Sequence, residues 1–314
     1  MSKLPEKFKN DEEVKTYNPW KKLAEDYDKL ALNDDCLYGE NNKYYCEDDL
    51  LAINDFNEKC KKWKETTDKI ITTIPVEPWW GNPLEAKLII LTLNPGYVPE
   101  VNESLAKLLQ SNEIIRSKLM DYKKKTLLLE AESFLPLPED DKDKPISLKE
   151  AVNMLGDWYW YKKLKPLKKE VEEKYKLTED EFFKHIALIE YHGYSSETSN
   201  HEFPLKNKKN KAPNYLETQI FIKKMIWYLA GKKDVRFLIM RSKDKWRNLL
   251  DDNNENFFDY NINEGVILCK TNKGMSQAIT RNNLKTEEDK KDNDQNNIYE
   301  KLLKIFEKSC QQTH

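Results

Sequence analysis

The chain has 314 residues, of which 39% are hydrophobic and 34% are charged, and its formal net charge is −2. This length allows one large domain or two average ones, and the composition is that of a soluble folded protein rather than a disordered chain. No apolar run reaches the length of a membrane span, and the polar start of the chain lacks the apolar core of a secretory signal. We therefore expect a cytoplasmic protein without a membrane partner.

The cysteines predict reduced thiols rather than a disulfide framework or a metal centre. They stand at Cys36, Cys46, Cys60, Cys269 and Cys310. None belongs to a Cys-x-x-Cys pair, and no cysteine and histidine have zinc-finger spacing. We accordingly expect neither a metal nor a cofactor.

The first part of the chain, residues 1–74, predicts a helical extension. Residues 18–32 and 47–70 carry apolar side chains at three- and four-residue spacing, which is typical of helices that bury one face. The proline-rich stretch Pro75–Pro83 follows and predicts an irregular lead-in to the next domain.

Four short apolar runs predict buried strands, at residues 88–93, 185–191, 234–240 and 264–270. Helical patterns at residues 170–184 and 215–231 lie between them. Buried strands that alternate with helices indicate a parallel sheet with helices on both faces. We expect a three-layer α/β/α fold with about four parallel strands over residues 75–284, a helical insertion at about 99–175, and a charged linker with a C-terminal helix over 285–314.

Each predicted strand ends in polar or turn-forming residues. These are Asn94-Pro95-Gly96, Glu190-Tyr191-His192, Arg241-Ser242 and Thr271-Asn272. In an open parallel sheet, ligands bind beyond the carboxyl ends of the strands. The four strand ends therefore predict one ligand cleft.

The residues around the first strand resemble a known family. Thr92-Leu93-Asn94-Pro95-Gly96 is similar to the first motif of the uracil-DNA glycosylase superfamily, in the branch that contains the mismatch-specific and single-strand-selective enzymes. That branch has Gly-hydrophobic-Asn-Pro-Gly after its first strand. Its mismatch-specific members have Asn-Pro-Ser-Gly-Leu-Ser after the last strand. The corresponding segment here is Thr271-Asn272-Lys273-Gly274-Met275-Ser276, which matches only in the Gly-apolar-Ser part. The resemblance covers roughly Pro75 to Leu284.

The resemblance implies a DNA glycosylase that flips a uracil, mismatched or modified base out of DNA and hydrolyses its N-glycosidic bond. Asn94 would position the attacking water, with Glu190 and His192 as further catalytic candidates. The implied substrate-binding residues are Pro95, Gly96, Tyr97, Tyr191, Arg241, Asn272, Gly274, Met275 and Ser276. Among them, Gly96 would let the backbone approach the base, and Tyr97 would either stack on the base or form the wall that limits it. Ser276 and amides near Gly274 would hold a phosphate, with Met275 as a wedge into the duplex.

Structural alternatives stand beside these functional roles. Asn-Pro-Gly is also an ordinary turn, and His192 is equally compatible with a bond to a backbone group. The carboxylate of Glu190 either contacts the base or pairs with Arg241. The aromatic and basic segment Gly156–Leu167 is compatible with a surface that stacks on single strands or with a helix that packs into the core.

One basic cluster predicts contact with the DNA backbone, and its alternative is a solvated face. It consists of Lys206, Lys208, Lys209 and Lys211.

Two other functions remain open for the whole chain. One is a catalytically silent module on the same fold that binds nucleic acid or a nucleotide, which the altered second motif favours. The other is a nucleotide hydrolase or transferase on a doubly wound sheet. Against that enzyme, the chain has neither G-x-G-x-x-G after a strand nor G-x-x-x-x-G-K-[ST].

Overall fold

The structure is a computed structural model of the whole chain. It describes residues 4–32, 43–63, 68–93, 107–132, 159–197, 203, 214–232, 234–251, 257, 266–269, 278–280, 284–285 and 295–310. The chain forms two compact units. The first comprises Met1–Pro78, Leu93–Glu130 and Glu190–Met225, and the second comprises Trp79–Thr92, Ala131–Ile189 and Ile226–His314.

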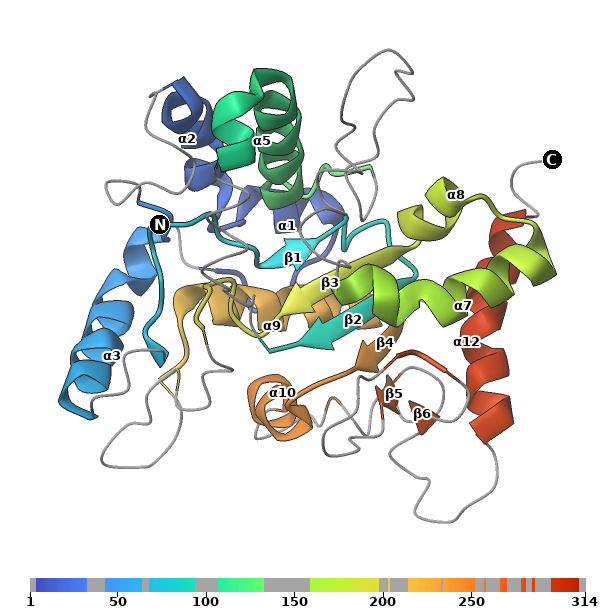
Figure 1. Cartoon of the computed structure of the whole chain (residues 1–314). Helices are drawn as coiled ribbons and strands as arrows, with labels where there is room; N and C mark the ends of the chain where they lie inside the picture. The colour runs from blue at the N-terminus through green and yellow to red at the C-terminus, as the bar shows by residue number, and fades with distance from the viewer. Residues whose placement is uncertain are drawn as a thin grey trace. The chain divides into compact units, whose positions relative to one another are not determined.

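A six-stranded sheet is the central layer of the second unit (Figure 1). Its strands are β1 (Trp79–Trp80), β2 (Leu88–Thr92), β3 (Ile186–Glu190), β4 (Arg236–Ile239), β5 (Val266–Cys269) and β6 (Leu284–Lys285). Their spatial order is β1-β3-β2-β4-β5-β6. The last residue of β3, Glu190, is grouped with the first unit.

The four central strands run in the same direction. β2 pairs with β4 in parallel register from Leu88 opposite Arg236 onward, and β4 pairs with β5 in the same way. Between β3 and β2, the carbonyl of His185 accepts from the N–H of Leu88 near their starts. Beyond their ends, the N–H of His192 donates to the carbonyl of Leu93. The edge strands β1 and β6 are antiparallel to their neighbours.

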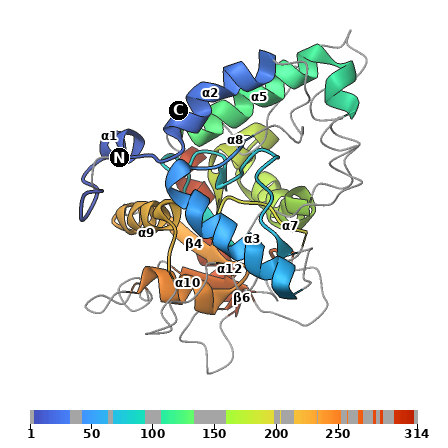
Figure 2. The same cartoon turned by 90° about the vertical axis from the view of Figure 1, so that its left-hand side faces the viewer.

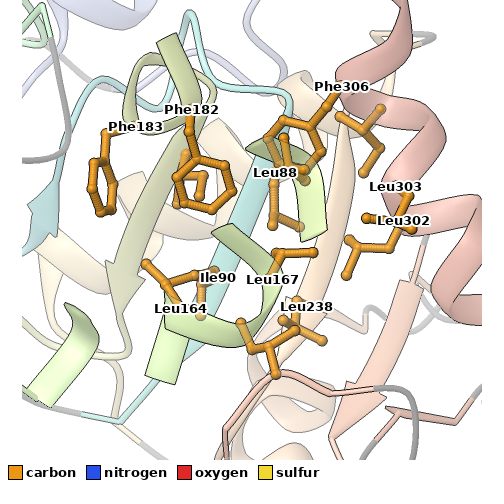
Figure 3. Packing of buried hydrophobic residues seen from close by; sticks show 14 of the residues in the cluster. Leu88, Ile90, Leu164, Leu167, Phe182, Phe183, Leu238, Leu302, Leu303 and Phe306 are labelled. Atoms are coloured by element: carbon orange, nitrogen blue, oxygen red, sulfur yellow. The ribbon is translucent and has the colours of Figure 1, made fainter. Parts of the chain in front are cut away.

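One face of the sheet is covered by α7 (Tyr159–Tyr175), α8 (Glu179–Lys184) and α12 (Gln295–Cys310), as Figure 3 shows in close-up. Alternate strand residues point to the same face, and on β2 these are Leu88 and Ile90, which are fully buried in the cluster. Thr178 begins α8 with a capping box, because its hydroxyl accepts from the N–H of Glu181 while the Glu181 carboxylate accepts from the N–H of Thr178.

The opposite face is covered by α10 (Lys243–Leu250) and the C-terminal end of α9 (Glu217–Ala230). Phe237 of β4 lies edge-on to Phe257 with ring centroids 5.6 Å apart. Trp227 of α9 also packs edge-on against Phe257, and its indole N–H donates to the carbonyl of Leu250 at 2.9 Å. Helices therefore cover both faces of the sheet.

The first unit is built mainly from helices. They are α1 (Asp11–Thr16), α2 (Lys21–Leu32), the short 3-10 helix η1 (Glu47–Asp49), α3 (Leu50–Trp63), α5 (Glu113–Leu127) and the first part of α9. Helices α2 and α5 lie side by side (Figure 2). Asn18, just before α2, donates from its side-chain amide to the carbonyl of Leu127 at 2.6 Å. Lys123 of α5 forms an ion pair of 2.5 Å with Glu77.

The expected fold class is confirmed: the second unit has three α/β/α layers around four parallel strands. The two edge strands were not expected. The lead-in Pro75–Pro83 was predicted to be irregular, but Trp79 pairs with Ile189 to form β1. Within the described ranges, every helix is too short or too polar to span a membrane.

Candidate functional site

The carboxyl edge of the sheet is where the sequence predicts a ligand site. From β2 the chain passes to β3 on one side, crosses to β4 on the other side of β2, and then continues to β5. The direction of winding therefore reverses at the β2–β4 pair. In open α/β sheets, ligands bind beyond the carboxyl ends of the strands at such a switch point.

The end of β2 is held firmly by its neighbours. The N–H of Met240, just after β4, donates to the carbonyl of Leu91 at 3.0 Å. The fully buried indole of Trp246 in α10 donates to the carbonyl of Thr92 at 2.8 Å. These two bonds hold the last two residues of β2, and the second of them, Thr92, is also the first residue of the motif. The motif residues Asn94, Pro95, Gly96 and Tyr97 themselves lie outside the described residues.

Arg241 is the second residue after β4 and is exposed. The next residue, Ser242, has φ 55° and ψ 45° and caps the start of α10. A left-handed conformation is unfavourable for a residue with a Cβ and is most frequent at functional turns. Arg241 thus projects from a sharp strand-to-helix turn at the switch point of the sheet.

The predicted second motif lies outside the described residues, so Asn272, Gly274, Met275 and Ser276 have no described position. The same holds for the basic cluster Lys206–Lys211. The strand before the second motif, β5, is parallel to β4 and ends at Cys269.

Glu190, Tyr191 and His192 lie together in one buried segment of the first unit. We call Glu190–Ser196 the post-β3 segment, and all of its residues are buried. The N–H of Glu190 donates to the carbonyl of Pro78 at 2.9 Å. The imidazole of His192 is fully buried and lies edge-on to Phe203, with ring centroids 5.1 Å apart. This packing favours a structural role for His192, and its catalytic role stays a prediction.

Glu190 belongs to the first unit and Arg241 to the second. Glu190 is only 3% exposed, although a carboxylate is costly to bury without compensation. Its two predicted roles, contact with the base and pairing with Arg241, both stay predictions.

A buried carboxylate that the sequence analysis did not single out lies beside the post-β3 segment. Asp49, the last residue of η1, is fully buried. It accepts hydrogen bonds from the hydroxyls of Tyr194 at 2.8 Å and Thr218 at 2.6 Å. The sequence did carry a signal for it, because Asp49, Ile53 and Phe56 have the spacing of one helix face.

Burial determines the electrostatics around Asp49. It raises the pKa of the Asp49 carboxyl to about 6, although the hydrogen bonds from Thr218 and Tyr194 lower that pKa. Burial also raises the pKa of the nearby Cys46 thiol to about 12. Because the thiolate is the reactive form, Cys46 is unsuited to act as a nucleophile.

The first unit also contains a half-open hollow of about 860 Å³. It is lined by residues of both charges, including Lys21, Lys43, Glu25 and Asp48, and by none of the predicted site residues. This mixed lining gives no preference for an anionic ligand.

In the part of the chain that the structure describes, no group of three or more His, Cys, Asp or Glu side chains has an arrangement that would hold a metal ion. Comparisons with protein-family models, curated proteins and solved structures gave no significant match.

Proposed function

We propose that this chain is a DNA glycosylase-like protein. It would flip a uracil, mismatched or modified base out of DNA and hydrolyse its N-glycosidic bond, with Asn94 positioning the water. The supporting observation is the direction of β2 and β5, which are both parallel to β4. In the sequence, the Asn-Pro-Gly motif follows β2 and the Gly-Met-Ser motif follows β5, and these two strands end at the edge where open α/β sheets bind ligands.

The chemistry proposed for Asn94 suits a neutral amide. An amide does not take a proton at neutral pH, but its oxygen accepts a hydrogen bond and so orients a water molecule against C1′ of the sugar. This is sufficient if the glycosidic bond is largely broken before water attacks, as in an oxocarbenium-like transition state. An exposed Arg241 at the same edge would contribute a positive charge toward the DNA backbone.

We expect Asn94→Ala to lower base excision by about 10²-fold or more, because a misplaced reactant costs a rate factor of that order. The assay measures abasic sites in oligonucleotides that carry uracil, mismatched thymine or modified cytosines. The matched control is Asn248→Ala, which truncates an exposed asparagine of α10.

Equal rates for wild type and Asn94→Ala would contradict the role of Asn94. DNA binding by the wild type without product on any substrate would contradict the enzymatic function. That second result would favour the silent binding module, the alternative that rests on Thr271-Asn272-Lys273 in place of Asn-Pro-Ser.

Glu190→Gln separates the two roles of Glu190. An ionised carboxylate accepts from the amino group of a cytosine-type base but repels the C4 carbonyl of uracil, whereas an amide can donate to that carbonyl. We expect Glu190→Gln to shift the excision preference toward uracil by about 10- to 100-fold, which corresponds to the roughly 1–3 kcal/mol typical of one base contact. The control is Glu197→Gln, which changes an exposed carboxylate just after the same segment. An unchanged preference would show that Glu190 is a structural partner.

A further inference from the structure

Asp49 joins three parts of the first unit that are far apart in the sequence. Its Oδ2 atom accepts from the Tyr194 hydroxyl at 2.8 Å and from Thr218 Oγ1 at 2.6 Å. Its Oδ1 atom accepts from the backbone N–H of Thr218, in the first turn of α9, at 3.4 Å. One carboxylate therefore links η1, the post-β3 segment and the start of α9.

Tyr194 is held from two sides by the residues around η1. Its hydroxyl donates to Asp49 and accepts from the backbone N–H of Cys46 at 3.1 Å. Its ring packs against Trp20, with ring centroids 5.5 Å apart. Since Tyr194 is fully buried, losing either bond would leave a polar atom without compensation from water.

The same turn of α9 holds the post-β3 segment at a second point. The side-chain amide of Gln219 donates to the carbonyl of Tyr191 at 3.1 Å, and its oxygen accepts from the N–H of Leu216. Two carbonyls of the segment are also bound. The N–H of Glu77 donates to the carbonyl of Gly193, and the N–H of Ile71 donates to the carbonyl of Ser195.

We infer that Asp49 is a positioning residue that holds the post-β3 segment, and through it Glu190, in place. The part of the inference that concerns Glu190 and its base rests on the proposed function. The positioning of the segment by Asp49 does not rest on the proposed function, because it is measured without DNA. This role goes beyond capping α9, which would require only the bonds to Thr218.

The first test compares two variants by amide hydrogen exchange, measured residue by residue by NMR. Tyr194→Phe removes the link from Asp49 to the segment, whereas Thr218→Val removes a side-chain link to α9. The probes are the amides of His192, Glu77 and Ile71. The reference is the amide of Leu128, the residue after α5, which donates to the carbonyl of Lys124 in that helix. We expect Tyr194→Phe to accelerate exchange at the three probes about tenfold and Thr218→Val to change it less than about twofold. Unchanged probes in Tyr194→Phe, or equal acceleration of the Leu128 reference, would overturn the inference.

The second test uses the charge of Asp49. The groups that face the carboxylate are the Tyr194 hydroxyl, the Thr218 hydroxyl and N–H, the backbone of Glu217 and the Cys46 thiol. On its own element, Glu47 and Asp48 are exposed, and Lys22 pairs with Glu47 at 2.8 Å. Burial raises the pKa of the Asp49 carboxyl from its ordinary value of 3.8 to about 6. The carboxyl therefore binds a proton more tightly while the post-β3 segment is closed over Asp49 than after the segment opens and exposes it.

Opening of the segment should therefore become harder as the pH falls from about 6 to about 4. We expect protection of the three probe amides, corrected for intrinsic exchange, to rise by up to about tenfold per pH unit over this range. Asp49→Asn should abolish the dependence, and Asp48→Asn, its exposed neighbour, should retain it. A flat profile in the wild type would overturn the inference. If base excision is absent, the proposed function fails while these exchange results still decide the role of Asp49.

Discussion

Replacing Gly193 with alanine is expected to lower the free energy of unfolding by about 3 kcal/mol or more, at the upper end of the cost of overpacking. A Cβ at this position would lie 2.8 Å from Cα and Cβ of Pro78 and 2.9 Å from its nitrogen. A proline backbone cannot yield easily, because its ring fixes φ. The bond from the N–H of Glu77 to the Gly193 carbonyl, 2.9 Å long, holds the two segments at this distance. Urea unfolding, monitored by tryptophan fluorescence, measures the loss in the free energy of unfolding.

The control for this variant is Gly231→Ala. There a new Cβ would approach only the carbonyl oxygen of Tyr228, at 3.3 Å, so we expect a change within about 1 kcal/mol. Similar losses in the two variants would contradict a steric role for Gly193.

Truncating Phe306 to alanine is expected to cost about 3–5 kcal/mol, the usual range for a large aromatic in a core. Its ring is fully buried and stacks on Phe182 of α8 at 5.3 Å with an interplanar angle of 18°. It also meets His185 edge-on at 6.3 Å, just before β3. Figure 3 shows Phe306 extending from α12 toward the residues of α8 and β2. Thermal unfolding by calorimetry measures this change.

The matched control is Lys304→Ala, because Lys304 is exposed on the same helix. We expect a change within about 0.5 kcal/mol there, as for most surface substitutions. A small loss in Phe306→Ala would show that α12 contributes little to the core of the second unit. The three-layer packing would then depend mainly on α7 and α8.

The sequence was sufficient to predict the four central strands of the sheet and the C-terminal helix of the second unit. A strand buried on both faces is mostly apolar, and β2 is such a run from Leu88 to Leu91. The start of α8 also carries its own signal, since Thr178 and Glu181 have the spacing of a capping box. Signals of this kind are local, so they remain visible without knowledge of the tertiary contacts.

The edge strands depended on their neighbours. Trp79–Trp80 has only two residues and lies in a proline-rich stretch, so no periodicity indicates a strand. It becomes one because Trp79 and Trp80 find partners in β3. Leu284–Lys285 becomes β6 for the same reason, by pairing with β5.

The sequence alone determined the fold class and the order of the strands along the chain, because apolar runs and helical periodicity depend only on residues that are close together in the sequence. Only the tertiary structure decided what surrounds Asp49 and Gly193. Two of three consecutive acidic residues, Glu47 and Asp48, are exposed, and the third is buried. The hydroxyls that make this burial tolerable come from residues 145 and 169 positions away. Likewise, the lack of room at Gly193 arises from the distant Pro78, a contact that no local pattern encodes.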